Sequence, residues 1–361
     1  MKIAFNNSIF FFQKNGGISR YFTSIAEELI KKNQEVKVIA PINKNNLLKG
    51  IPSENKISFY LKRYPSFKFL EDTNNKITNH YVQKFEPNIF HETYYSNYPY
   101  DYNKSKKIIT VYDLIHEKFS NYFTNEKIIK KKEIIKNYDH YICISENTKK
   151  DLINIYKIPE KKISVIYLSG SHYRNSNLIT EKKIKEKKIK EKKFFLYVGS
   201  RGVYKNFKLI VECFRNNKNL NEHKIICFGG GQFTIDEKKY FNKLNISHVD
   251  GDDNILVKLY KEAKCLILPS EYEGFGIPAL EAMELGCPVL SSNTAALKET
   301  CGDAALYFNP YSEEELMHKI NLLTLNDSLR NELIKKGLER AELFSWKKCA
   351  EQTLTLYNSI L

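Results

Sequence analysis

The stretch that most constrains the fold of this chain is a glycine-bearing loop that turns directly into a helix, Pro269-Ser270-Glu271-Tyr272-Glu273-Gly274-Phe275-Gly276-Ile277-Pro278-Ala279-Leu280-Glu281-Ala282-Met283. Pro278 suits the first helical position, because its missing N–H costs nothing there. Gly286 is expected just beyond the helix in a left-handed conformation. A helix that begins at such a loop presents free N–H groups and the positive end of its dipole, so the stretch predicts an anion site.

Glu273 and Glu281 belong to the same predicted site, although a carboxylate does not bind phosphate. We interpret both as acceptors for hydroxyl groups. The alternative is that Glu273 complements the helix dipole and that Glu281 is a solvated helix residue. An anion site with hydroxyl acceptors predicts a sugar carried on a phosphate.

Apolar strand-like runs alternate with helical patterns in both halves of the chain, which is typical of parallel α/β sheets. The length of 361 residues exceeds one ordinary core. We therefore expect two doubly wound, Rossmann-like domains with ligands at the carboxyl ends of their strands. The predicted strands are 2–5, 36–39, 88–91, 107–111 and 140–144, then 194–198, 224–228, 265–268 and 289–291; the predicted helices include 18–32, 146–156 after the N-cap Ser145, 254–263 and two within 312–342.

Residues 181–193 form a low-complexity segment with eight lysines and three glutamates. Too few apolar residues are present for a core element, so the segment indicates a solvated linker or a charged surface helix, with contact to an anionic membrane as an alternative. The expected organisation is an N-terminal domain in 1–175, a charged linker in 176–193, a C-terminal domain in 194–343 and a last helix in 344–361 that returns to the N-terminal domain.

The net charge of +15 favours an acidic partner: nucleic acid, anionic lipid or a phosphorylated substrate. A solvated, lysine-rich surface explains the charge equally well. The seven cysteines are scattered without a Cys-x-x-Cys pair and are expected to be buried and reduced. No apolar run reaches the ~18–20 residues that span a bilayer. The N-terminus lacks the apolar region of a signal peptide. We expect a cytoplasmic protein whose only membrane contact would be peripheral, at the inner face of the cytoplasmic membrane.

Two further segments follow strands and precede helices. Gly16-Gly17 allows close backbone approach to a ligand, or is a tight structural turn. Arg201 and Lys205 follow the strand 194–198, at the edge where a diphosphate would lie, and the alternative is surface charge on a turn.

These motifs together resemble the retaining GT-B glycosyltransferases of family 4, in particular the mannosyltransferase-like branch that builds bacterial surface polysaccharides such as O-antigen or capsule. The resemblance covers nearly the whole chain. It is carried by Gly16-Gly17-Ile-Ser-Arg-Tyr, Ile144-Ser145-Glu-Asn-Thr, Val198-Gly199 through Lys205-Asn206, Glu273-Gly-Phe-Gly-Ile-Pro-Ala-Leu-Glu281, Gly286-Cys-Pro-Val and Glu299-Thr-Cys-Gly302-Asp-Ala-Ala.

The resemblance implies a GT-B fold and retaining transfer of a hexose from a nucleotide-sugar donor to a saccharide or lipid-linked saccharide acceptor. Arg201 and Lys205 would hold the donor diphosphate, Glu281 the ribose and Glu273 the sugar. No cofactor or metal is expected, since these cations and the helix N-terminus supply the positive field. The implied catalytic residues are Arg201, Lys205, Glu273 and Asp113; the implied donor-binding residues are Gly16, Gly17, Gly199, Arg201, Lys205, Asn206, Glu273, Gly274, Phe275, Gly276, Ile277 and Glu281.

The acceptor side of the N-terminal domain departs from the family pattern. The His-Asp pair that much of this branch carries after the strand 107–111 is Tyr112-Asp113 here, and His116 is displaced by four positions. His91 matches a family position on the acceptor side, and either histidine is otherwise an ordinary polar residue near a strand end. The expected acceptor-side residues are His91, Tyr95, Tyr112 and His116, because the cluster Tyr94-Tyr95-Ser-Asn-Tyr98-Pro-Tyr100 provides rings for stacking on sugars or for loop packing.

Two other functions remain open at this point. A GT-B relative that epimerises or hydrolyses a nucleotide sugar would share these motifs. A basic nucleic-acid-binding protein would share the charge, but the lysines lack interleaved aromatic residues of a recognisable module, so no nucleic-acid partner is expected. Asp250-Gly251-Asp252 formally matches a metal-binding Asp-x-Asp motif, and Asp252 or Asp253 is more simply the cap of helix 254–263.

Overall fold

The structure is a computed structural model that describes residues 1–63, 68–101, 104–123, 131–170, 194–217, 220, 223–242 and 244–361. Its internal contacts divide the chain into two compact units. The N-terminal unit comprises Met1–Leu168 together with Trp346–Leu361, and the C-terminal unit comprises Ser169–Ser345. The predicted linker, 176–193, lies outside the described residues.

The N-terminal unit is built on a seven-stranded sheet in the order β3-β2-β1-β4-β5-β6-β7, and all of its pairings are parallel. The order reverses beside β1, which is the sign of a doubly wound sheet. The strands are β1 (Lys2–Phe5), β2 (Glu35–Asn43), β3 (Lys56–Tyr60), β4 (Ile89–Glu92), β5 (Lys106–Val111), β6 (His140–Cys143) and β7 (Ile163–Val165).

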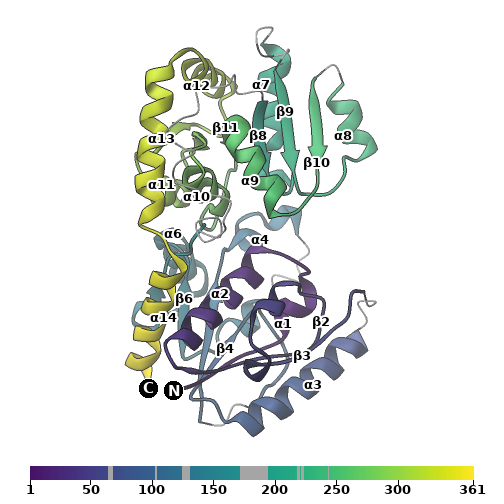
Figure 1. The fold of residues 1–361 in the computed structure, drawn as a ribbon, viewed down its shortest axis with the longest axis vertical. Coiled ribbons are helices and arrows are strands. Elements are labelled where there is room, and N and C mark those ends of the chain that lie inside the picture. Colours follow the sequence, from purple (N-terminus) through teal and green to yellow (C-terminus); the bar gives the residue numbers. More distant parts are fainter. Residues whose placement is uncertain are drawn as a thin grey trace. The chain divides into compact units, whose positions relative to one another are not determined.

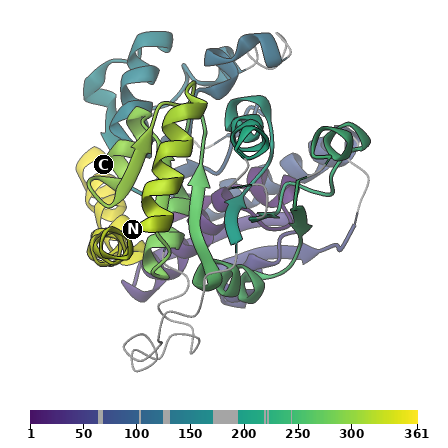
Figure 2. The same ribbon diagram turned by 90° about the horizontal axis from the view of Figure 1, so that it is seen from above.

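The helix α2 (Gly17–Lys31) shows how the sequence forms this unit. Residues at helical spacing, from Tyr21 to Leu29, are buried on one face, and Gln13 accepts from the Ser19 N–H in the first turn. The last helix, α14 (Trp346–Ile360), packs against α2, and both views show the chain ends near one another in this unit (Figures 1 and 2). The other helices are α1 (Ser8–Phe12), α3 (Lys68–Phe85), α4 (Ile115–Lys118) and α6 (Glu146–Tyr156), with short 3-10 turns η1 (Leu47–Gly50), η2 (Ser53–Asn55), η3 (Ser120–Tyr122) and η4 (Glu160–Lys162).

The C-terminal unit is a six-stranded parallel sheet in the order β10-β9-β8-β11-β12-β13. The strands are β8 (Phe194–Val198), β9 (Lys224–Phe228), β10 (Ile246–Val249), β11 (Ala263–Leu268), β12 (Val289–Ser292) and β13 (Ala305–Phe308). The helices are α7 (Phe207–Asn216), α8 (Ile235–Tyr240), α9 (Asp253–Glu262), α10 (Ile277–Glu284), α11 (Ala295–Cys301), α12 (Glu313–Leu325) and α13 (Asp327–Glu342), with the 3-10 turn η6 (Val203–Lys205).

The predicted α/β architecture with two doubly wound sheets is confirmed. Ser145 caps α6, accepting from the Thr148 N–H at 3.0 Å, and Asp252 caps α9. Gly286 has the expected left-handed φ of +68° after α10, whereas Pro278 is the second helical residue because Ile277 begins the helix. All seven cysteines are free and buried.

The sequence reading missed the four edge strands, β3, β7, β10 and β13, and it ended β2 too early. Pro41 interrupts the pattern of β2, but the structure accommodates it at a bulge between Ala40 and Ile42, and the strand continues to Asn43. At that bulge the Ile42 N–H donates to the Asn74 side chain at 2.8 Å. β3 is half exposed, so it carries no continuous apolar run that would predict a strand.

Two expected absences concern metals and membranes. Among the residues that the structure describes, no three His, Cys, Asp or Glu side chains gather as metal ligands. Asp252 is the cap of α9, as its alternative reading proposed. Within the same described part of the chain, none of the helices combines the length and the apolar character that crossing a bilayer requires.

Two buried polar groups follow one another at the end of β4. His91 lies between the Tyr357 hydroxyl at 2.6 Å and the Thr110 hydroxyl at 2.9 Å, and burial lowers its pKa to about 3. Burial raises the pKa of Glu92 to about 7, although Lys107 at 3.1 Å opposes the shift. The two groups therefore have opposite effects on the pH dependence of stability.

His91 generates a prediction about stability in acid. The unfolded chain binds a proton at this residue near pH 6.5, whereas the folded chain does not until about pH 3, so His91 destabilises the fold as the pH falls through this window. Between pH 7 and pH 5 we expect the free energy of unfolding of the wild type to fall by about 2 kcal/mol more than that of His91→Gln. Urea unfolding at both pH values measures the difference. Equal losses in both proteins would contradict the proposed neutral His91.

Candidate functional site

The site predicted in the C-terminal unit lies where its strand order reverses, between β8 and β11. Doubly wound sheets bind ligands at this position, beyond the carboxyl ends of the strands. The segments that follow the two strands are 199–206 and 269–276. They are joined directly, because the Glu271 N–H donates to the Tyr204 carbonyl at 2.8 Å. The topology thus brings together the two stretches that the sequence singled out.

Lys205 and Glu273 form an ion pair across these two segments. The Lys205 Nζ atom lies 2.7 and 2.8 Å from the two carboxylate oxygens of Glu273, and both side chains are partly exposed. The Ser270 hydroxyl donates to the Glu273 Oε1 atom at 2.7 Å. Ser270 was not predicted as a site residue, although it lies three positions before Glu273.

The start of α10 is held in place by contacts around Gly276. This glycine has a φ of +111°, and a Cβ atom there would lie 2.6 Å from the Leu297 side chain. The Thr300 hydroxyl fixes the preceding turn by donating to the Phe275 carbonyl at 2.6 Å. Gly274, Phe275 and Ile277 therefore lie on the loop and first turn that were predicted to present backbone N–H groups, and the Phe275 ring itself is buried.

Glu281 lies one turn into α10 and is buried. The Tyr260 hydroxyl, at the end of α9, donates to its Oε2 atom at 3.0 Å. This contact argues against the alternative of a solvated helix residue. Tyr260 orients the carboxylate, and sequence spacing alone did not reveal this partner, because the two residues are 21 positions apart.

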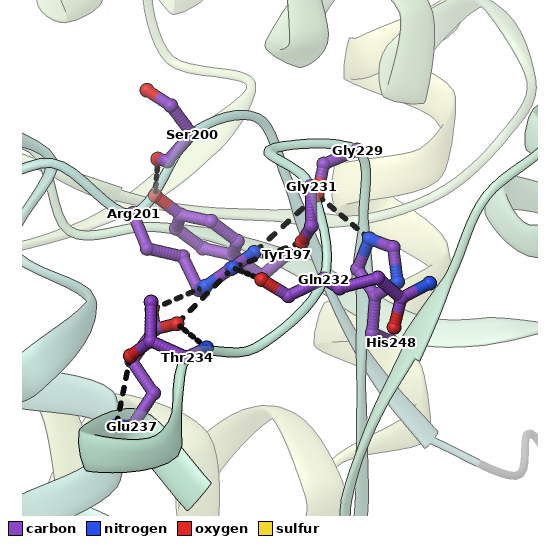
Figure 3. A network of polar contacts seen from close by, with 9 residues as sticks. All are labelled: Tyr197, Ser200, Arg201, Gly229, Gly231, Gln232, Thr234, Glu237 and His248. Carbon is purple, nitrogen blue, oxygen red and sulfur yellow. Dashed lines mark hydrogen bonds and ion pairs between the residues drawn. The ribbon is translucent and has the colours of Figure 1, made fainter.

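Arg201 is engaged by the protein itself (Figure 3). Its side chain is only 5% exposed. The Nε atom lies 2.6 Å from Glu237 on α8, and the other two guanidinium nitrogens donate to main-chain carbonyls of the segment after β9. These bonds reach Gly229 at 3.4 Å, Gly231 at 2.9 Å and Gln232 at 3.3 Å. The hydrogen bond from Arg201 is also the main cause of the lowered pKa of Glu237.

The two glycine-bearing segments that Arg201 joins pack against each other. A Cβ atom on Gly230 would lie 2.5 Å from the Gly199 carbonyl oxygen, so only glycine fits there. Gly199 and residues 229–231 all have φ between +71° and +124°. The Tyr197 hydroxyl donates to the Ser200 carbonyl at 2.5 Å, and His248 contacts the Gly229 carbonyl at 3.1 Å (Figure 3). Arg201, paired with Glu237, joins residues 199–202 to residues 229–232. We name this pair together with the two segments the glycine-loop latch.

Asn206 was predicted to bind the donor, and the structure gives its side chain another contact. Its amide donates to the Pro310 carbonyl at 2.7 Å. The residue has a left-handed φ of +52° and precedes α7. The contact holds segment 199–206 against the turn after β13.

The structure gives different surroundings to the residues that were predicted for the acceptor side of the N-terminal unit. Tyr112 follows β5, and its buried hydroxyl has no hydrogen-bond partner among the described residues; the same holds for the Tyr95 hydroxyl. Asp113 accepts from the Ile115 N–H at 3.2 Å, two positions before α4 begins. His116, on α4, stacks on Phe123 with ring centroids 4.3 Å apart. The predicted roles of these four residues stay predictions.

His91 does not lie on an accessible surface, contrary to what an acceptor contact needs. It is fully buried, and Tyr357 and Thr110 occupy both ring nitrogens. The structure therefore places His91 in the core, in agreement with the alternative of an ordinary polar residue. Gly16 and Gly17 lie at the start of α2 as expected, and the Gly16 carbonyl accepts from the Ser19 hydroxyl at 3.0 Å.

The glycine-loop latch generates a prediction that separates it from direct phosphate binding by Arg201. Arg201→Ala and Glu237→Gln should each lower the free energy of unfolding, because each leaves a partner of a largely buried ion pair unpaired. The double variant should lose less than the sum, with a coupling of about 1–3 kcal/mol. Urea unfolding gives the cycle, and amide exchange at residues 229–232 should accelerate in both single variants.

The matched control is Glu332→Gln, which removes an exposed carboxylate on α13, 2.8 Å from Lys336, and should leave this exchange unchanged. Binding of inorganic pyrophosphate supplies the opposing result. If Arg201 is instead a phosphate ligand, Glu237 competes with phosphate for its guanidinium group. Glu237→Gln will then strengthen pyrophosphate binding, which would contradict a purely structural role of the glycine-loop latch.

Two protein-family models match this chain, one within each of its two units. Residues 15–168 match the family model described as Glycosyltransferase Family 4, and residues 179–340 match Glycosyl transferases group 1. O-antigen chain mannosyltransferase B of Escherichia coli is 41% identical over 105 residues, which are 29% of this chain and 28% of that protein. O-antigen chain mannosyltransferase RfbU of Salmonella typhimurium is 30% identical over 205 residues, 54% of each chain. The chain thus spans about a quarter to a half of the length of these relatives.

Solved structures match nearly the whole fold. WaaG, a glycosyltransferase involved in lipopolysaccharide biosynthesis, aligns with a TM-score of 0.74 and 15% identity over 97% of this chain and 98% of that one. A glycosyltransferase from Rickettsia africae aligns with a TM-score of 0.73 and 20% identity over 99% and 98% of the two chains. The chain therefore belongs to the GT-B glycosyltransferases, with a family 4 domain in residues 15–168 and a group 1 domain in residues 179–340.

Proposed function

We propose that this chain transfers a hexose, with mannose as the first candidate, from a nucleotide-diphosphate donor to a saccharide of a bacterial surface polysaccharide. The observation that carries the proposal is the Lys205–Glu273 pair beside the start of α10, at the reversal of the C-terminal sheet. Relatives named as O-antigen mannosyltransferases support the choice of sugar and product. A lipid-linked acceptor is part of the proposal, as is a position at the inner face of the cytoplasmic membrane.

The positive half of the site fits a diphosphate leaving group. Lys205 contributes a positive charge, and the start of α10 contributes the positive end of its dipole. A diphosphate gains negative charge as the sugar leaves, so these fixed groups stabilise the transition state more than the ground state. In this proposal Arg201 supports the site indirectly, because the glycine-loop latch holds segment 199–202.

The carboxylates fit hydroxyl groups of the donor. Glu273 receives two bonds from Lys205 and one from Ser270, and a carboxylate offers about four lone-pair positions. One position on the Oε2 atom therefore remains for a sugar hydroxyl, as far as the described residues show. Glu281, oriented by Tyr260, is proposed to accept from the ribose hydroxyls.

Retention of configuration is proposed to follow a front-face route. The leaving phosphate oxygen takes the proton of the acceptor hydroxyl while that hydroxyl attacks the same face of the sugar. Lys205 stays protonated and neutralises the diphosphate in this step, and no metal ion is required. Asp113 is proposed to act at the acceptor side, with Tyr95, Tyr112 and His116 contacting the acceptor sugar.

The donor is tested first by thermal shift across GDP-, UDP- and other nucleotide sugars, since a bound ligand stabilises the fold. We expect GDP-mannose to give the largest shift. Lys205→Ala should weaken donor binding about tenfold to a hundredfold, because a charge-assisted contact is lost. Lys208→Ala is the matched control, since this lysine is exposed three positions away. Equal effects of the two variants, or no shift with any nucleotide sugar, would contradict the donor site.

The reaction itself is tested by product stereochemistry. Proton NMR of product formed with an α-linked donor should show the α configuration, and turnover should survive an excess of EDTA. An inverted product, or activity that EDTA abolishes and magnesium restores, would overturn the proposed route. Donor consumption that is equally fast without any acceptor would instead support an epimerase or hydrolase.

A further inference from the structure

A lysine that the sequence analysis did not single out is buried in the N-terminal unit together with its counter-ion. Lys131, in the helical turn 131–134 that precedes β6, is only 7% exposed. Its Nζ atom lies 3.1 and 3.2 Å from the two carboxylate oxygens of Glu117 on α4. The Tyr156 hydroxyl, at the end of α6, also donates to Glu117. Three separate elements therefore meet at one buried ion pair.

The same ammonium group contacts two residues that are proposed for the acceptor side. It donates to the Asp113 carbonyl at 3.1 Å, and it lies 4.9 Å from the centre of the Tyr95 ring. Burial raises the pKa of Tyr95, and the charge of Asp113 raises it further, which indicates that this carboxylate lies near the ring. Tyr95 follows β4 and Asp113 follows β5, and these strands are neighbours. Lys131 thus joins the segments after two adjacent strands, at the edge where parallel sheets bind ligands.

These contacts favour a role in which Lys131 holds other residues rather than touching a substrate. An ammonium group has three N–H donors, and here they serve the Glu117 carboxylate and the Asp113 carbonyl beside the Tyr95 ring. Burying an ion pair costs so much desolvation that its replacement by apolar side chains is often neutral or stabilising. Stability alone is therefore a weak reason to bury a lysine at this point, whereas joining a carbonyl to a ring requires a cation there.

We infer that Lys131 is a positioning residue of the acceptor side, which fixes the main chain at Asp113 and the ring of Tyr95 relative to one another. Reacting atoms must be held about 3–3.5 Å apart, and a misplacement of about 1 Å can cost roughly 100-fold in rate. Loss of the Lys131 contacts should therefore impair use of the acceptor and leave donor binding unchanged. This kinetic consequence rests on the proposed function, whereas the positioning itself does not.

The competing explanation is that the buried ion pair only holds α4 against α6. Glu117 lies on α4 and its second partner, Tyr156, lies on α6. A neighbouring ion pair joins the same two helices, because the Lys118 Nζ atom lies 2.7 Å from Asp151. Variants of Glu117 and Lys118 therefore loosen the two helices while the Lys131 ammonium is kept, and they provide matched controls.

Amide hydrogen exchange tests the positioning without any substrate. Lys131→Met removes the ammonium group and keeps an unbranched apolar side chain, whereas Glu117→Gln leaves the Lys131 donors available to the Asp113 carbonyl. Both should lower the urea midpoint, because each leaves one partner of a buried ion pair unpaired. Exchange at residues 112–115 should accelerate roughly tenfold or more in Lys131→Met and less than about threefold in Glu117→Gln. Lys118→Gln should leave it unchanged.

Steady-state kinetics test the consequence for transfer, with GDP-mannose as the donor and methyl α-mannoside as the acceptor probe. Lys131→Met should raise the KM for the acceptor roughly tenfold or more, while the KM for the donor and the thermal shift with GDP-mannose stay as in the wild type. Lys131→Arg should restore part of the acceptor KM, because it returns a cation with several donors. If Lys131→Met does not fold, Glu117→Gln/Lys131→Met removes both charges and gives the same comparison.

The outcomes separate positioning from the alternative and from the proposed function. Exchange at 112–115 that accelerates equally in Lys131→Met and Glu117→Gln would overturn the inference and make the pair a link between helices. Acceptor and donor KM values that rise together would overturn it as well. A wild type that transfers nothing to the probe, with exchange at 112–115 still faster in Lys131→Met alone, would count against the proposed function and support the positioning.

Discussion

The ion pair between Lys205 and Glu273 is the contact on which the ligand edge of the C-terminal unit depends. Each residue lies on a segment that would otherwise diverge from the other, because the strand order reverses between β8 and β11. The pair and the Glu271–Tyr204 main-chain bond hold the two segments together. A charge that is already positioned needs no reorganisation when a ligand arrives, which is the condition for strong electrostatic stabilisation.

Two cations four residues apart have different uses in this structure. Lys205 pairs with the Glu273 carboxylate and remains partly exposed, whereas the Arg201 guanidinium has donors enough to bind a carboxylate and three carbonyls together. A lysine ammonium could not span the same set of acceptors. The glycine segments after β8 and β9 therefore depend on the several donors of an arginine, whereas the site nearby uses the point charge of a lysine.

Local signals in the sequence predicted most of the fold. Apolar runs followed by glycine located eight of the parallel strands closely, and Ser145 and Asp252 marked helix starts, because these are short-range effects. The four edge strands β3, β7, β10 and β13 were missed, since partly exposed edges carry no continuous apolar run. The structure brings the predicted residues Lys205 and Glu273 together. The contacts that Ser270, Tyr260 and Glu237 make with predicted site residues were not assigned, because tertiary folding decides which polar side chains meet. For the same reason the core position of His91 was not predicted.

The return of α14 to the N-terminal unit has a consequence for the order of events during synthesis. This unit begins before the C-terminal unit in the chain but needs Trp346–Leu361 to cover α2. Residues 169–345 are all available before α14 is made, so the unit that starts second has its full set of elements first. The first unit must wait through the translation of the whole second unit with one helix face uncovered, and a chaperone that shields apolar surface would find its substrate there.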